Sequence, residues 1–289
     1  MNKDLQGTSG LIAPKALLFD LDGTLYRGEA MIPGADRLIA GLQRSGIPYR
    51  FVTNNSTKTP EEVALHLRKL GIPADEKSIV TSALGAAYYV LKHHPGAETF
   101  VIGEEGLRQA LRNAGLRLIE EGEAAGPAAL VVQGMDRRLT YDRLAAGVHH
   151  ILNGAVYVLT NPDRVLPVEG GFLPGAGSIG AALKAATGIE PIVIGKPSHI
   201  LMDYALEQSG TAPEETWVIG DNPYTDIAAA RNAGCPAILV LTGLCDADDW
   251  REHCRSADVV PNAVCADLDE LVSLIQDRTS NRELRTEGK

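Results

Sequence analysis

Two aspartates, one residue apart, follow a short apolar segment near the start of the chain. Asp20 and Asp22 come directly after residues 16–19 and are followed by Gly23 and Thr24. In open α/β sheets, ligands bind just beyond the carboxyl ends of the strands. Two like charges at such a place are costly without a cation, and Mg²⁺ binds through one or two carboxylates plus substrate phosphate. The pair predicts phosphate chemistry with Mg²⁺; an acidic turn is the alternative, because Asp and Gly also favour turns.

Three later apolar segments also end in polar side chains. Thr53, Asn54 and Asn55 follow residues 51–52, Lys196 follows residues 191–195, and Asp221 follows residues 216–220. A carboxylate nucleophile, hydroxyl and amide donors, a cation and metal-binding acids together are what phosphoryl transfer requires.

Each of these signals has a structural alternative when it is taken alone. Residues 53–56 could form a turn or the entry to a helix, and Lys196 could be an ordinary lysine at the end of a strand. Asp226 could cap a helix over residues 227–232, a role that Asp fills well. The combination of all four segments favours the catalytic interpretation.

The four segments resemble the motifs of the haloacid dehalogenase (HAD) superfamily of phosphatases. Shorter motifs at 134–136, 160–163, 175–177 and 195–198 are similar to those of its p-nitrophenyl phosphatase and NagD-like branch, which carries a type IIA cap domain. The likeness extends from about residue 17 to about residue 271. It implies a doubly wound parallel-sheet core with a smaller inserted α/β cap.

The resemblance also implies a role for each residue. Asp20 would be the nucleophile, and Asp22 the general acid and then the base for water. Gly23, Thr53, Asn54, Asn55 and Lys196 would bind the phosphate. Asp20, Asp221 and the main-chain carbonyl of Asp22 would bind Mg²⁺, while Asn222 and Asp226 would lie around the metal and could hold its water or orient Lys196.

Strand and helix patterns alternate along the chain, which predicts a parallel sheet flanked by helices. The stretch between Thr53 and Lys196 is too long for a single crossover, and it contains its own predicted strands (99–102, 130–133, 156–159) and helices (105–113, 141–152, 179–186). We therefore predict a discontinuous core over residues 1–80 and 191–289, and a cap over residues 81–190. A final helix is expected over residues 267–275, followed by a polar, unstructured tail from 277.

Composition limits the range of partners. The 289 residues carry a net charge of −10, which disfavours binding to nucleic acid. Residues 1–10 lack the apolar core of a signal peptide, and no apolar run approaches the ~20 residues of a membrane span. The four cysteines are nine to eleven residues apart, with no Cys-x-x-Cys pair; this spacing is poor for zinc and predicts reduced thiols. We expect a cytoplasmic protein, with a homo-oligomer left open.

The resulting prediction is a Mg²⁺-dependent phosphatase for small phosphorylated metabolites, such as a sugar phosphate, a nucleoside monophosphate or p-nitrophenyl phosphate. The cap loops at 135–136 and 161–164 are expected to contact the leaving group. Two alternatives stay open: a phosphomutase that uses the same Asp pair, and a phospho-accepting receiver-like signalling domain.

Overall fold

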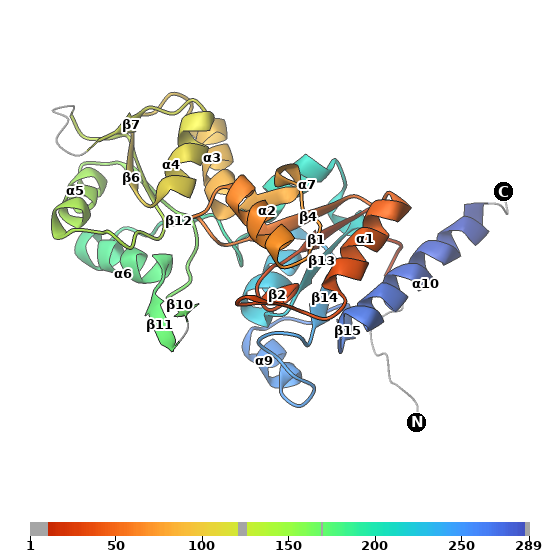
Figure 1. Cartoon of the computed structure of the whole chain (residues 1–289). Coiled ribbons are helices and arrows are strands. Elements are labelled where there is room, and N and C mark those ends of the chain that lie inside the picture. Colours follow the sequence, from red (N-terminus) through yellow and green to blue (C-terminus); the bar gives the residue numbers. More distant parts are fainter. Residues whose placement is uncertain (1–10, 121–125, 169, 287–289) are drawn as a thin grey trace. The chain divides into compact units, whose positions relative to one another are not determined.

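The computed structural model describes residues 11–120, 126–168 and 170–286, which fold as two compact units (Figure 1). The first falls within Met1–Val52, Ala64–Ile79 and Ala205–Lys289, and the second within Thr53–Val63 and Val80–Tyr204. The prediction that residues 1–10 lack the apolar core of a signal peptide concerns a segment outside the described residues.

The first unit is built on a six-stranded sheet in the order β15-β14-β13-β1-β4-β5. These strands are β1 (Ala16–Phe19), β4 (Tyr49–Thr53), β5 (Ile79–Thr81), β13 (Thr216–Gly220), β14 (Ala237–Val240) and β15 (Ala263–Cys265). The pairings of β1 with β4 and β13, of β13 with β14 and of β14 with β15 are all parallel. Because the chain builds outward from β1 through β4 and later returns to its other side at β13, the order reverses between β1 and β13. Ligands of open α/β sheets bind at such a reversal.

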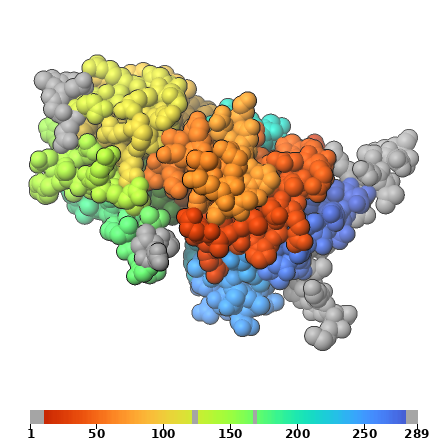
Figure 2. All heavy atoms as spheres, in the orientation of Figure 1, coloured from red at the N-terminus to blue at the C-terminus, as the bar shows by residue number. Residues whose placement is uncertain are grey.

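Helices flank this sheet. They are α1 (Ala35–Ser45), α2 (Pro60–Lys69), α7 (His199–Ser209), α8 (Ala228–Ala233), α9 (Trp250–Ser256) and α10 (Leu268–Thr286), with the single-turn elements η1 (Glu76–Ser78), η2 (Pro213–Glu215) and η3 (Pro223–Ile227). Two of them, α2 and α7, also have residues in the second unit. A short hairpin, β2 (Tyr26–Arg27) and β3 (Ala30–Met31), follows β1. Although they come from opposite ends of the chain, α1 and α10 lie side by side (Figure 2).

The second unit has its own five-stranded sheet in the order β12-β9-β8-β6-β7. Its strands are β6 (Thr99–Ile102), β7 (Leu118–Ile119), β8 (Leu130–Gln133), β9 (Val156–Leu159) and β12 (Ile192–Val193), and its helices are α3 (Ser82–His93), α4 (Glu105–Asn113), α5 (Tyr141–Leu152) and α6 (Ala176–Thr187). A hairpin, β10 (Val165–Val168) and β11 (Gly171–Pro174), precedes α6.

The alternation of side chains along these strands explains why helices cover both faces of the second sheet. Val101 and Val132 pack with apolar residues of α3 and α4, whereas Phe100, Ile102 and Val131 pack with residues of α5 and α6. Successive residues of a strand point to opposite faces, so both faces need a cover (Figure 1).

The structure confirms the predicted α/β class and parallel sheets, and it differs from two finer expectations. We expected the strand before Lys196 to belong to the core sheet, but β12 pairs with β9 in the second unit. An apolar strand pattern does not say which sheet the strand joins, since both sheets are apolar. The predicted tail is also wrong in part, because α10 continues to Thr286.

In the described part of the chain, no helix has both the length and the apolar character that a membrane span requires.

Candidate active site

The end of β1 is fixed by the neighbouring strand β13. All four residues of β1 are buried, and Phe19 is in register with Ile219. The Asp20 N–H then donates to the Ile219 carbonyl at 2.8 Å. Since the two strands are parallel, Asp20 and Asp221 leave the sheet at the same edge, at the reversal of strand order.

Three carboxylates meet there. Ligand oxygens of Asp20, Asp221 and Asp226 lie within 4.8 Å of one another. The buried Thr24 hydroxyl joins the group, at 3.3 Å from Asp221 Oδ1 and 3.5 Å from Asp20 Oδ2. Carboxylates this close repel one another unless a cation or protons intervene, and an all-oxygen donor set suits a hard divalent cation.

Two glycines make room for the Asp221 carboxylate. A Cβ on Gly23, which has φ +87°, would lie 2.4 Å from Asp221 Oδ2, and a Cβ on Gly243 would lie 1.9 Å from the same atom. The Leu244 N–H donates to this oxygen at 2.7 Å. The Thr242 hydroxyl donates to the Gly23 carbonyl at 2.7 Å, so the loop after β14 is tied to the loop after β1.

Asp22 stands apart from the three clustered carboxylates. Its side chain reaches solvent and accepts a hydrogen bond from the Gly28 N–H at 3.4 Å. Partial burial raises the pKa of Asp22, and the charge of Asp20 raises it further, against the lowering effect of the Gly28 hydrogen bond. A carboxyl group with a raised pKa keeps its proton to higher pH, which suits a general acid.

Asn222 and Asp226 shape the segment after β13. The Asn222 side chain caps η3 by accepting from the Tyr224 N–H at 2.9 Å, and the Asn222 N–H donates to Asp226 Oδ2 at 3.2 Å. Asp226 is buried inside η3 and is not its cap. The cap that the sequence allowed Asp226 to form is not made, because α8 begins at Ala228 without a side-chain cap. Asn222 caps η3 instead, and Pro223 follows it at the first position of that turn.

In the second unit, residues 53–59 form a tight turn ahead of α2. The Asn55 N–H donates to the Thr53 hydroxyl at 3.1 Å, and Asn55 Oδ1 accepts from the Thr57 N–H at 2.8 Å. Thr59 and Glu62 then form a reciprocal capping box, with distances of 2.8 and 3.3 Å, and Pro60 opens the helix. The predicted turn and helix entry over residues 53–56 are confirmed. The phosphate-binding role of these residues stays a prediction.

Asn54 links this turn to the segment that carries Lys196. Its Nδ2 donates to the Lys196 carbonyl at 3.0 Å and to the Asp163 carboxylate at 3.2 and 3.3 Å. The Asn161 side chain donates to the Asn54 carbonyl at 2.9 Å. Lys196 is only 3% exposed. The Asn54 amide therefore positions Lys196 and the loop at 161–163.

Similarity to known proteins identifies the family. A haloacid dehalogenase-like hydrolase model matches residues 17–117, and a HAD-hydrolase-like model matches residues 193–271. The 5'-nucleotidase YutF of Bacillus subtilis (strain 168) is 41% identical over 261 residues, which cover 90% of this chain and 98% of that protein. This chain belongs to the haloacid dehalogenase-like hydrolase family.

Two further relatives narrow the branch. An acid sugar phosphatase of Staphylococcus aureus (strain MRSA252) is 41% identical over 91% of this chain and 98% of its own length. The structure of a p-nitrophenyl phosphatase from Archaeoglobus fulgidus matches with a TM-score of 0.84 at 32% identity, over 90% of this chain and 99% of that one. The resemblance to the NagD-like branch is confirmed, and the chain is an enzyme of the phosphatase class in the HAD family.

The two predicted leaving-group loops of this HAD enzyme differ in character. Asp136 is buried, accepts from the Arg138 N–H at 2.9 Å and forms an ion pair with Arg143 at 3.2 Å. Arg164, by contrast, has an exposed side chain just before β10. Asp136 therefore stabilises the second unit, and Arg164 is the better candidate for a substrate contact.

Sequence reasoning missed the part that the loop at 242–244 plays. The sequence carries no local signal for it, because its contacts with Gly23 and Asp221 join segments that are distant in the chain.

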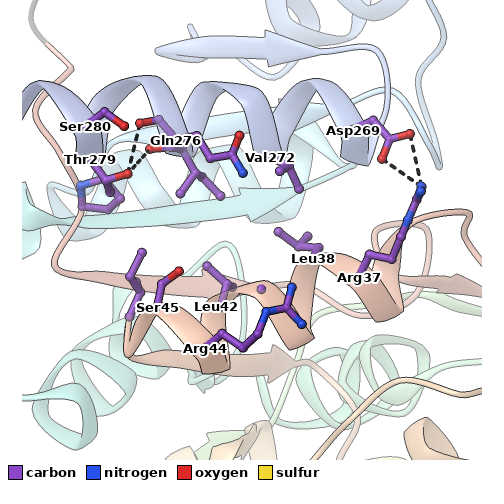
Figure 3. A pocket seen from close by; sticks show the side chains of 14 residues that line it. Arg37, Leu38, Leu42, Arg44, Ser45, Asp269, Val272, Gln276, Thr279 and Ser280 are labelled. Carbon is purple, nitrogen blue, oxygen red and sulfur yellow. Dashed lines mark hydrogen bonds and ion pairs between the residues drawn. The ribbon is translucent and has the colours of Figure 1, made fainter.

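A groove of about 760 Å³ between α1 and α10 (Figure 3) is lined by none of the predicted site residues, and an exposed Arg37–Asp269 ion pair lies at one end of it.

Proposed function

We propose that this HAD enzyme is a Mg²⁺-dependent phosphatase that hydrolyses small phosphorylated metabolites through a phosphoryl group on Asp20. The observation that supports this most is the group of Asp20, Asp221 and Asp226 at the reversal of strand order, with ligand oxygens within 4.8 Å.

The donors at this position fit Mg²⁺. They are hard oxygens, and Gly23 and Gly243 leave room for the Asp221 carboxylate where a Cβ would collide with it. Asp20, Asp221 and the Asp22 carbonyl would hold the ion, with Asn222 and Asp226 around it. When bound, Mg²⁺ would neutralise phosphate charge and carboxylate repulsion.

The first half-reaction would transfer the phosphoryl group to the enzyme. An Asp20 carboxylate oxygen attacks phosphorus, and the bond between phosphorus and the leaving oxygen breaks. Asp22 gives its proton to that oxygen, so the alcohol leaves neutral. The raised pKa of Asp22 supports this role, because it increases the fraction of Asp22 that is protonated near neutral pH.

The second half-reaction would return Asp20 to its carboxylate form. Asp22, now deprotonated, takes a proton from water as that water attacks phosphorus. The bond between Asp20 and phosphorus breaks and inorganic phosphate leaves. Splitting the displacement in this way replaces one difficult step by two easier ones.

The remaining predicted residues would bind the transferring phosphoryl group. Gly23 and the turn of Thr53, Asn54 and Asn55 would offer hydroxyl and N–H donors, and Lys196 would offset negative charge. The hydrogen bond from Asn54 to the Lys196 carbonyl supports a joint role for the turn and the lysine.

Small metabolites are the substrate class that we favour. The relatives are named as a 5'-nucleotidase, an acid sugar phosphatase and a p-nitrophenyl phosphatase, which supports small phosphate monoesters. The net charge of −10 disfavours nucleic acid as a substrate. A cytoplasmic location stays a prediction, and the oligomeric state stays open.

Two alternatives remain distinguishable. A receiver domain has no second acid two residues after the phosphorylated Asp and accumulates a long-lived phosphoryl-Asp. A phosphomutase would return a rearranged sugar phosphate in place of inorganic phosphate. Analysis of the reaction products, inorganic phosphate, a phosphoryl-enzyme or a rearranged sugar phosphate, therefore tests both alternatives.

The test is phosphate release from p-nitrophenyl phosphate and from a panel of sugar phosphates and nucleoside monophosphates. We expect turnover with Mg²⁺, loss of turnover after chelation and recovery on adding Mg²⁺. Ca²⁺ should substitute poorly, because its coordination is looser. Undiminished turnover in excess chelator would overturn the metal assignment, and no phosphate release from any compound with Mg²⁺ present would overturn the function.

A further inference from the structure

A second group of metal-ligating side chains lies in the first unit, in the segment after β14. Cys245 Sγ, an Asp249 carboxylate oxygen and a His253 ring nitrogen lie within 4.8 Å of one another. Cys245 is buried, whereas Asp249 and His253 are partly accessible. The three residues follow a Cys-x₃-Asp-x₃-His spacing with a single cysteine, so the spacing between cysteines gave no indication of this group.

The local fold holds these side chains in place. Asp246 and Asp249 fix the loop through mutual contacts, since the Asp246 N–H donates to Asp249 Oδ1 at 2.9 Å and the Asp249 N–H donates to Asp246 Oδ1 at 3.1 Å. Helix α9 begins at Trp250, and residues four apart on a helix lie on the same face. His253 is therefore stacked one turn beyond Asp249.

The His253 ring is oriented by a partner on its other side. The Tyr224 hydroxyl lies 3.2 Å from Nδ1, and Nε2 lies 3.5 Å from Asp249 Oδ2. A metal-ligating histidine in most sites uses one ring nitrogen for the metal and the other for a hydrogen bond that fixes the ring. In this structure Tyr224 contacts Nδ1 of His253, so Nε2 of His253 faces Asp249.

We propose that Cys245, Asp249 and His253 bind a divalent transition-metal ion such as Zn²⁺, separately from the all-oxygen site at Asp20. Thiolate, imidazole and carboxylate are the ligands that Zn²⁺ takes in proteins, and three protein ligands leave a fourth position for water. Mg²⁺ does not compete well for sulfur and nitrogen ligands. On binding, the Cys245 thiol loses its proton to solvent and a bond forms between sulfur and the metal.

An ion pair between Asp249 and His253, with Asp249 also accepting from the Asp246 N–H, is the simpler alternative. It accounts for these two residues, but it gives no reason for the buried thiol to lie beside them. The ligand atoms of all three residues lie within 4.8 Å of one another, close enough to share one cation. A cation would offset the negative charge of Asp249 beside the thiol.

The position of the site links it to the loop that holds Asp221. Leu244, whose N–H donates to Asp221 Oδ2 at 2.7 Å, directly precedes Cys245. An ion on Cys245 would restrain this loop and raise the thermal stability of the enzyme, because a ligand that binds only the folded state stabilises it.

The test is a Co²⁺ titration of the intact enzyme in excess Mg²⁺, followed by absorbance. Coordination to Cys245 should give a thiolate-to-Co²⁺ charge-transfer band with a stoichiometry of about one ion per chain. Binding of Co²⁺ at the acidic site cannot produce this band, because its ligands are oxygens. Adding Zn²⁺ should displace Co²⁺ and abolish the band.

Variants identify the ligands. Cys245→Ser should abolish the band, and Asp249→Asn and His253→Gln should weaken Co²⁺ binding. Tyr224→Phe should weaken it by about 10–100-fold, the usual effect of removing the partner of a ligating histidine. Cys265→Ser and the exposed neighbour Asp248→Asn are matched controls and should leave the titration unchanged.

Two results would overturn the site: a folded wild-type enzyme that shows no thiolate band with Co²⁺, or a band that survives Cys245→Ser. If Cys245→Ser fails to fold, by thermal unfolding, the decision passes to His253→Gln and Tyr224→Phe, and undiminished affinity in both would overturn it. These readouts do not depend on phosphatase activity, so a failure of the proposed function would leave them unaffected.

Discussion

At the residue scale, the Asp221 carboxylate is the most closely confined group of the candidate active site. Its oxygens meet the Thr24 hydroxyl and the Leu244 N–H, and Gly23 and Gly243 pack against it without side chains. The sequence predicted Asp221 because the residue follows an apolar strand. It could not predict Gly243, because that contact forms only when β13 and β14 are placed side by side.

Gly243→Ala should therefore impair metal-supported turnover. Gly243 does not have a positive φ, so the added Cβ meets one obstacle, the Asp221 side chain, with Oδ2 at 1.9 Å, Cγ at 2.4 Å and Cβ at 2.7 Å, and must displace it. We expect at least a tenfold fall in kcat/KM, about 1.4 kcal/mol of transition-state stabilisation, and a higher Mg²⁺ requirement. Gly126→Ala, where a Cβ meets open space, is the control. Equal Mg²⁺ dependence in both variants would contradict the crowding argument.

At the element scale, strong periodic patterns were predicted well and weak ones were not. Helices α4 and α5 and strands β8 and β9 have the predicted bounds, because the helices have a clear amphipathic pattern and the strands are short, mostly apolar runs. The two-residue strands β7 and β12 are too short to show a period. In α3 small residues dominate, so its buried face is defined by packing and not by a stripe of large apolar side chains.

The Glu104–Arg137 pair gives a pH-dependent prediction for an element of the second unit. The Glu104 carboxylate oxygens accept hydrogen bonds from the Arg137 guanidinium at 2.5 and 2.7 Å and from the Arg137 main-chain N–H at 3.0 Å. These contacts lower the pKa of Glu104. A carboxyl group whose pKa is lower in the folded than in the unfolded state stabilises the fold at pH values above its unfolded pKa, about 4.3. That stabilisation is lost as the pH falls through the folded-state pKa.

Glu104→Gln should thus cost about 0.5–1 kcal/mol near neutral pH, a modest value because Arg137 is 59% exposed. The difference from wild type should shrink as pH falls below about 4. Thermal unfolding across pH measures it, with the more exposed Glu105→Gln as control. A difference that is constant across pH would mean that the ion pair is not its source.

At the scale of the whole molecule, two units of similar architecture divide the predicted tasks. The acidic cluster belongs to the first unit, whereas Lys196, Asn54 and Arg164 belong to the second. The sequence indicated two α/β domains, since each has its own alternation of strands and helices. The sequence did not predict the exact division between them, because the apolar strand at 192–193 suits either sheet and the turn at 53–59 carries no pattern that assigns it to one unit.

This division predicts that leaving-group selectivity resides in the second unit. Arg164→Ala should change kcat/KM unequally across phosphorylated metabolites, with a weaker effect on p-nitrophenyl phosphate, while thermal unfolding stays unchanged. Asp136→Ala should instead cost about 1–3 kcal/mol of stability, because it leaves Arg143 without its buried partner. An equal fall for every substrate with Arg164→Ala would argue against a contact with the leaving group.

The central claim is that Asp20 is the nucleophile, and the rate of p-nitrophenyl phosphate hydrolysis by Asp20→Asn tests it most directly. The variant should unfold at nearly the wild-type temperature and lose essentially all turnover, whereas Asp36→Asn, in the first turn of α1, should retain it. A folded Asp20→Asn enzyme that keeps more than about a tenth of the wild-type rate, ~1.4 kcal/mol of barrier, would contradict covalent catalysis by Asp20.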